Sequence, residues 1–137
     1  DDIPVDRKDP ASRGSVLVRA QRKLDHGTSV MFFAEGTRSR DGRLHEGHGG
    51  AAWMAYDTGA TVVPVGLIGT GTVKPFSHLV PGRSRIEVHF GEPLDLSDLD
   101  GVPAGKARRQ ITERTMNAIA ALSGQERSGE VYASSRD

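Results

Sequence analysis

A cluster of polar side chains follows an apolar run in the first third of this 137-residue chain. Immediately after residues 29–34 come a carboxylate, a glycine, a hydroxyl and two guanidinium groups, at Glu35, Gly36, Thr37, Arg38 and Arg40. Guanidinium groups present planar sets of donors that match phosphate oxygens, and glycine allows a ligand to approach the backbone closely. We therefore interpret residues 35–40 as an anion site for a phosphate ester that also carries hydroxyl groups.

The apolar run itself predicts the element that positions this site. Residues 29–34 are almost entirely apolar, which is typical of a strand that is covered on both faces in a parallel sheet. In open parallel sheets, ligands bind just beyond the carboxyl ends of the strands, where residues 35–40 lie. A helix is expected before the strand, from Asp9 and Pro10 to Gly27, and a second helix is expected from Gly49 to about Gly59.

The remainder of the chain predicts two more strands and a long helix. Residues 61–68 form a β-branched run that contains Pro64, so an edge strand or a bulge stays open there. Residues 85–90 alternate, with Ile86, Val88 and Phe90 on one face, which predicts a half-buried strand. A helix is expected over residues 104–122. The predicted fold is an α/β domain with a mostly parallel central sheet flanked by helices over residues 1–124, and a polar, flexible tail over 125–137.

Composition excludes several classes of function. The chain has no cysteine, which removes thiol catalysis and disulfides, and its 18 basic and 18 acidic residues balance to zero net charge. Aromatic residues make up 5% and are not interleaved with the basic ones, so nucleic-acid binding is not expected. No apolar run is long enough to span a membrane. His45 and His48 have no third ligand at a suitable spacing, so no metal site is expected.

The segment Phe33-Ala34-Glu35-Gly36-Thr37-Arg38-Ser39 resembles a sequence block of the glycerolipid acyltransferases, the 1-acyl-glycerol-3-phosphate (lysophosphatidate) acyltransferase family. That block reads Phe-Pro-Glu-Gly-Thr-Arg-Ser, and Ala34 stands where the family usually has proline. Val63-Pro64-Val65 resembles a second block, and Arg7, which follows Asp6, resembles the arginine of a third. The resemblance extends over roughly residues 3–94.

The resemblance implies a substrate and a role for each matching residue. It implies an enzyme of phospholipid biosynthesis that transfers a fatty acyl group from acyl-CoA or acyl carrier protein to 1-acyl-glycerol-3-phosphate, with no other cofactor. Such an enzyme would act peripherally at the cytoplasmic face of a membrane. Arg7 and Arg38 would hold the phosphate, Glu35 would position the glycerol, and Gly36 and Thr37 would shape the turn. Further matching positions are Ser39 and Arg40 in the substrate site and Val63, Pro64 and Val65 in the strand block.

The family's catalytic base does not match any part of this sequence. In the family, that base is a histidine followed five positions later by an aspartate, and none of the five histidines here has this partner. We therefore assign no catalytic residue and expect an N-terminally truncated chain that is inactive alone. Asp41 and His45 form the one alternative pair in the loop, but the sequence positions no nucleophile beside them. A non-catalytic module that binds a phosphate ester or a phospholipid headgroup stays open as the second function.

Overall fold

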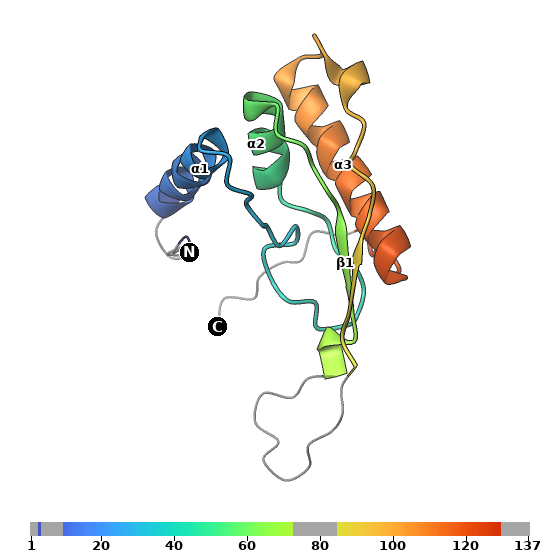
Figure 1. Cartoon of the computed structure of the whole chain (residues 1–137). Coiled ribbons are helices and arrows are strands. Elements are labelled where there is room, and N and C mark those ends of the chain that lie inside the picture. The colour runs from blue at the N-terminus through green and yellow to red at the C-terminus, as the bar shows by residue number, and fades with distance from the viewer. Residues whose placement is uncertain (1–2, 4–9, 73–84, 130–137) are drawn as a thin grey trace.

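The computed structural model describes residues 3, 10–72 and 85–129, which form a small α/β structure (Figure 1). Its elements in chain order are α1 (Pro10–Asp25), α2 (Gly50–Thr58), β1 (Val65–Ile68), the 3-10 turn η1 (Thr70–Thr72), β2 (Glu87–Phe90), the 3-10 turn η2 (Ser97–Leu99) and α3 (Ala104–Ser123). The three predicted helices are confirmed. Within the described ranges, no helix has the length and apolarity needed to cross a membrane.

A glycine in the left-handed conformation follows each helix. Residues that carry a side chain rarely adopt this conformation, so glycine is favoured there. After α1, Gly27 has a φ of 74° and the Thr28 N–H donates to the Lys23 carbonyl at 2.9 Å. Gly59 and Gly124 have φ values of 67° and 71° after α2 and α3. The helix ends were therefore readable from the sequence.

The core lies where the first half of α3, with Ala107 and Ile111, packs against α2, and β1 lies against the end of α3 at Leu122 (Figure 1). Its members are mostly small side chains, which let the two helices approach closely: Ala52, Ala55, Leu99, Ala107 and Ile111. Met116 is the largest fully buried side chain of the described residues. It lies on α3 beneath Gly47, in the loop of residues 26–49 that joins α1 to α2. The helix α3 therefore supports both the sheet and the loop that carries the candidate site.

The sheet is an antiparallel pair in which Val65 is opposite Phe90 and Leu67 is opposite Val88. The predicted mostly parallel sheet is not seen in the described ranges. Gly66 faces α3 so closely that an added Cβ would lie 2.7 Å from the Leu122 Cβ. The missing side chain of Gly66 thus lets α3 lie directly on the backbone of β1.

The prediction of a buried strand over residues 29–34 is wrong. These residues form no strand, and Met31 and Phe33 are 80% and 68% exposed. A strand requires a neighbour to complete its backbone hydrogen bonds, and in the described ranges neither β1 nor β2 pairs with this segment. The segment is an extended connection between α1 and the polar loop.

The apolar face of β2, which the sequence pattern predicted to be the buried one, is exposed. Ile86, Val88 and Phe90 are 50%, 49% and 74% exposed, because α3 covers the face that carries Gly66. The alternation along residues 85–90 was identified correctly. The helix α3 packs on the other face of the sheet, where Gly66 of β1 leaves room for it.

Pro64 precedes the strand and does not interrupt it. Its carbonyl accepts a hydrogen bond from the Gly91 N–H at 2.9 Å, and β1 begins at the next residue. The absent N–H of proline therefore costs no ladder hydrogen bond of β1, which answers the question that the sequence left open.

Candidate functional site

The Glu35–Arg40 segment begins with a tight turn that only glycine can complete. The Gly36 N–H donates to the Phe33 carbonyl at 2.9 Å, and Gly36 has a φ of 64°. An added Cβ would lie 2.7 Å from Cδ2 of His48, whose own N–H donates to the Ala34 carbonyl at 2.8 Å. Residues 34–36 are therefore held against the far side of the same loop.

The predicted site residues differ in their contacts and in their exposure to solvent. The carboxylate of Glu35 accepts a hydrogen bond from the His45 N–H at 2.7 Å, which holds it toward the inside of the loop. Arg38 and Arg40 are exposed, whereas Thr37 and Ser39 are half-buried. No hydrogen bond or ion pair joins Glu35 to Arg38 in the part of the chain that the structure describes.

Arg7, the other predicted phosphate ligand, lies outside the described residues. Of the predicted block that comprises Val63, Pro64 and Val65, Pro64 is buried and Val65 opens β1. The structure thus leaves two exposed arginines, Arg38 and Arg40, shortly after a carboxylate that the His45 N–H fixes.

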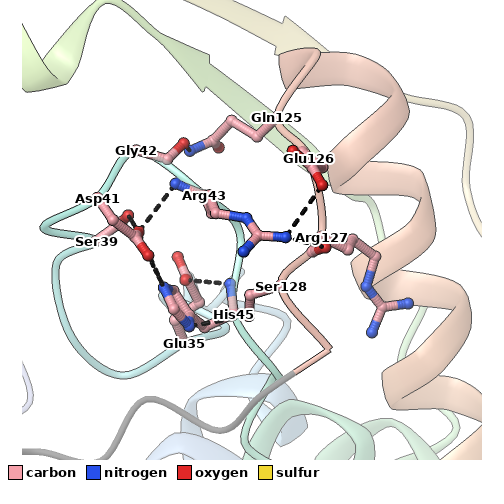
Figure 2. Close-up of polar contacts among 10 residues, drawn as sticks. All are labelled: Glu35, Ser39, Asp41, Gly42, Arg43, His45, Gln125, Glu126, Arg127 and Ser128. Carbon is pink, nitrogen blue, oxygen red and sulfur yellow. Dashed lines mark hydrogen bonds and ion pairs between the residues drawn. The ribbon is translucent and has the colours of Figure 1, made fainter.

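His45 is the centre of a polar cluster that the sequence did not reveal in full (Figure 2). Its imidazole is buried, and its Nε2 lies 3.0 and 3.1 Å from the two carboxylate oxygens of Asp41. Its Nδ1 lies 2.9 Å from the hydroxyl of Ser128, which is 83 positions away in the sequence. An ionised carboxylate only accepts hydrogen bonds, so in the neutral imidazole Nε2 carries the proton and Nδ1 accepts from Ser128.

Asp41 is held in its ionised form by the hydrogen bonds that it accepts. The hydrogen bond from His45 and then that from the Arg43 N–H lower the pKa of Asp41 from 3.8 to about 2. The Ser39 hydroxyl also donates to this carboxylate at 3.0 Å. At neutral pH the Asp41 carboxylate is therefore ionised, and its contact with Nε2 orients the His45 ring.

Residues 125–128, the first of the predicted tail, lie against the polar loop. The Leu44 N–H donates to the Glu126 carbonyl and the Ser128 N–H donates to the Leu44 carbonyl, each at 2.9 Å, so the two segments form a short parallel bridge. Arg43 donates to the Glu126 carboxylate at 3.0 Å and to the Arg127 carbonyl at 3.3 Å. Residues 130–137 lie outside the described ranges.

Arg127 connects this terminal segment to α3 and to the loop at once. Its guanidinium donates to Glu46 at 2.9 Å, to Asn117 at 2.7 Å and to both carboxylate oxygens of Glu113. The side chain is 19% exposed, so these are partly desolvated, charge-assisted hydrogen bonds. They fix Ser128, the next residue, relative to His45.

A cavity of about 450 Å³ lies between α2 and η2, away from residues 35–40. Tyr56, Leu96 and Ile111 are among its lining residues, and none of the predicted site residues belongs to the lining. No group of three or more metal-ligating side chains occurs among the residues that the structure describes.

Comparison with known proteins agrees with the resemblance of the sequence blocks. The family model described as Acyltransferase matches residues 1–68. A chloroplastic 1-acyl-sn-glycerol-3-phosphate acyltransferase of Arabidopsis thaliana is 41% identical over 114 residues, covering 81% of this chain and 31% of the relative. The chain belongs to the glycerolipid acyltransferase family. Acyltransferases of the same printed name from Brassica napus (chloroplastic) and Streptococcus pneumoniae are 38% and 31% identical, covering 85% and 71% of this chain and 34% and 33% of the relatives.

This acyltransferase-family chain spans about a third of the length of these curated relatives. No solved structure matches it significantly. The family block that holds Glu35 and Arg38 falls inside the matched residues 1–68, whereas Ser128 lies beyond them. Sequence reasoning missed the contribution of Ser128 to the loop because no local pattern marks a contact over 83 positions.

The lowered pKa of Asp41 predicts how acid affects stability. Because that pKa falls from 3.8 to about 2 on folding, the carboxylate stabilises the folded chain above pH 3.8, and this contribution is lost as the pH falls through about 2. Asp41→Asn should therefore lower the free energy of unfolding at neutral pH and have little effect at the acid end. Urea unfolding of both proteins across this range checks the prediction, and an equal difference at every pH would contradict it.

Proposed function

We propose that this chain carries the acceptor-binding part of a glycerolipid O-acyltransferase that acts on 1-acyl-glycerol-3-phosphate in phospholipid biosynthesis. The observation that carries the proposal is the family block itself, in which Glu35 is fixed by the His45 N–H while Arg38 and Arg40, a few positions later, are exposed. Exposed guanidinium groups are suited to a phosphate, and a fixed carboxylate is suited to a glycerol hydroxyl. The printed names of the relatives support the same acceptor.

In the proposed complex, Arg38 and Arg7 bind the phosphate and Glu35 accepts a hydrogen bond from a glycerol hydroxyl. Acyl-CoA or acyl carrier protein supplies the acyl group. Peripheral contact with a membrane belongs to the same proposal, because Met31 and Phe33 are 80% and 68% exposed immediately before the site. Large apolar side chains in water next to a lipid-binding site are suited to an acyl-chain or bilayer surface.

One observation favours the second function, a module that binds a glycerophosphate headgroup without catalysis. The sequence contains no histidine followed five positions later by aspartate. We therefore propose that this chain alone binds the acceptor and does not transfer an acyl group to it. Both functions use the same arginines and differ only in turnover.

Calorimetric titration with lysophosphatidate below its micelle concentration tests the proposed site. Arg38→Ala should weaken binding about tenfold or more, since a charge-assisted hydrogen bond contributes about 1.5–3 kcal/mol and a tenfold change in affinity corresponds to about 1.4 kcal/mol. Arg109→Ala is the matched control, because Arg109 is an exposed arginine on α3. Equal affinities for all three proteins would contradict the proposal.

An assay of phosphatidate formation from acyl-CoA separates the two functions. We expect no lysophosphatidate-dependent product from this chain alone. Product whose formation is abolished by Glu35→Ala would show that the chain is itself a complete catalyst.

A further inference from the structure

We propose that Asp41, His45 and Ser128 form a second reactive site, in which the Ser128 hydroxyl is a nucleophile toward small carboxylic esters. The proposal does not depend on lysophosphatidate binding, but its residues contact the Glu35–Arg40 block: the His45 N–H donates to Glu35 and the Ser39 hydroxyl donates to Asp41. It assigns a chemical role to the imidazole of His45 and to the hydroxyl of Ser128, which the proposed function does not use.

The three side chains are arranged in the order that nucleophilic catalysis requires. Asp41 accepts from Nε2 of His45 through both carboxylate oxygens, at 3.0 and 3.1 Å, which orients the ring and fixes its tautomer. Nδ1 lies on the opposite side of the ring and 2.9 Å from the Ser128 hydroxyl. A hydroxyl within hydrogen-bond reach of a base that is itself oriented by a carboxylate is the pattern of an activated nucleophile.

The surroundings hold this arrangement in place and shield the base. The His45 side chain is 8% exposed, whereas that of Asp41 is 47% exposed. The imidazole is therefore shielded from water, while the carboxylate that orients it lies near the surface. The Ser128 N–H donates to the Leu44 carbonyl, directly before His45 in the chain, which fixes the hydroxyl relative to the imidazole. Ser128 itself is half-buried, which suits a small ester better than a long acyl chain.

A guanidinium group also contacts the residue before Ser128. The Arg43 guanidinium donates to the carbonyl of Arg127, the residue immediately before Ser128 (Figure 2). Its Nε is buried and has no hydrogen-bond partner among the described residues. Charged groups that contact His45 in the described part of the chain include Asp41 at Nε2 and Glu35 at the backbone N–H.

The proposed reaction is ester hydrolysis in two steps. The Ser128 oxygen forms a bond to the acyl carbon while its proton passes to Nδ1 of His45, and the carbonyl π electrons move to oxygen. Collapse of this intermediate breaks the bond to the leaving alcohol, which takes the proton from Nδ1. Water then attacks the acyl-serine in the same way, which releases the carboxylic acid and returns the proton to Ser128.

Labelling with a fluorophosphonate, read by mass spectrometry of the Ser128 peptide, and hydrolysis of p-nitrophenyl acetate together test the site. We expect an adduct at Ser128, ester hydrolysis above the buffer rate, and loss of both in Ser128→Ala. General-base assistance contributes about 10²–10⁴-fold, so His45→Gln should slow both reactions by at least about a hundredfold. Ser97→Ala is the matched control, because the Ser97 hydroxyl donates to Asp95 at 2.7 Å without an intervening histidine.

A second variant and a pH profile separate this role from a purely structural one. Asp41→Asn retains an acceptor at an exposed position but removes the charge that fixes the tautomer, and it should slow labelling by about tenfold or more while circular dichroism still shows a folded chain. In the wild type, the rate should fall on acidification because a protonated imidazole cannot accept the serine proton. An unlabelled Ser128, a rate independent of pH, or equal labelling of Asp41→Asn would overturn the proposal.

Discussion

Gly66→Ala should lower the free energy of unfolding by about 3 kcal/mol, since overpacking a close contact typically costs about 1–3 kcal/mol and sometimes more. The added methyl would lie 2.7 Å from the Leu122 Cβ and 2.9 Å from both the Leu122 carbonyl carbon and the Ser123 nitrogen. Two of these neighbours are backbone atoms of α3, which cannot turn aside as a flexible side chain can. The whole helix must move away from β1, and urea unfolding measures the loss.

Gly105→Ala provides the control for this substitution. Gly105 lies in the first turn of α3, and an added Cβ would meet nothing within 4 Å. The free energy of unfolding should stay the same or rise by up to about 1 kcal/mol, because alanine favours the helix over glycine. If both variants were equally stable, the close packing of α3 on β1 would be contradicted.

Met116→Ala should lower the free energy of unfolding by about 2–5 kcal/mol, the usual range for truncating a buried large side chain. Met116 is fully buried, and a Cβ added to Gly47 would lie 2.7 Å from its sulfur. The truncation therefore leaves a void beneath the loop that joins His45 to His48. Met31→Ala is the control, because Met31 is 80% exposed and its truncation should change stability by less than about 0.5 kcal/mol.

The double variant Gly47→Ala/Met116→Ala tests the contact more specifically. Gly47→Ala alone forces the methyl against the Met116 sulfur, whereas the truncated background leaves room for it. The two losses of stability should therefore not add, and the coupling between them should reach about 1 kcal/mol. Strictly additive losses would show that these residues do not pack together.

Local signals in the sequence predicted the helices and failed for the sheet. Gly27, Gly59 and Gly124 mark helix ends because the left-handed conformation is a property of one residue and its neighbours. A strand depends on partners elsewhere in the chain. Residues 29–34 have a strand-like composition, but neither described strand pairs with them, so Met31 and Phe33 stay exposed.

The candidate site divides in the same way. Glu35, Arg38 and Arg40 were found from a contiguous pattern, and the structure adds only how each side chain is oriented. Asp41 and His45 are only four positions apart in one loop, and the pair was considered from the sequence. The Ser128 hydroxyl could not be, because its place beside His45 depends on a bridge between Leu44 and Arg127 and on the ion pairs of Arg127 with α3 and the loop.

Amide chemical shifts of the ¹⁵N-labelled chain during titration with lysophosphatidate test the acceptor site most directly. The proposed site predicts saturable shifts centred on residues 36–40 that vanish in Arg38→Ala and persist in Arg109→Ala. Shifts confined to the cavity between α2 and η2, or shifts at residues 36–40 that survive Arg38→Ala unchanged, would contradict it.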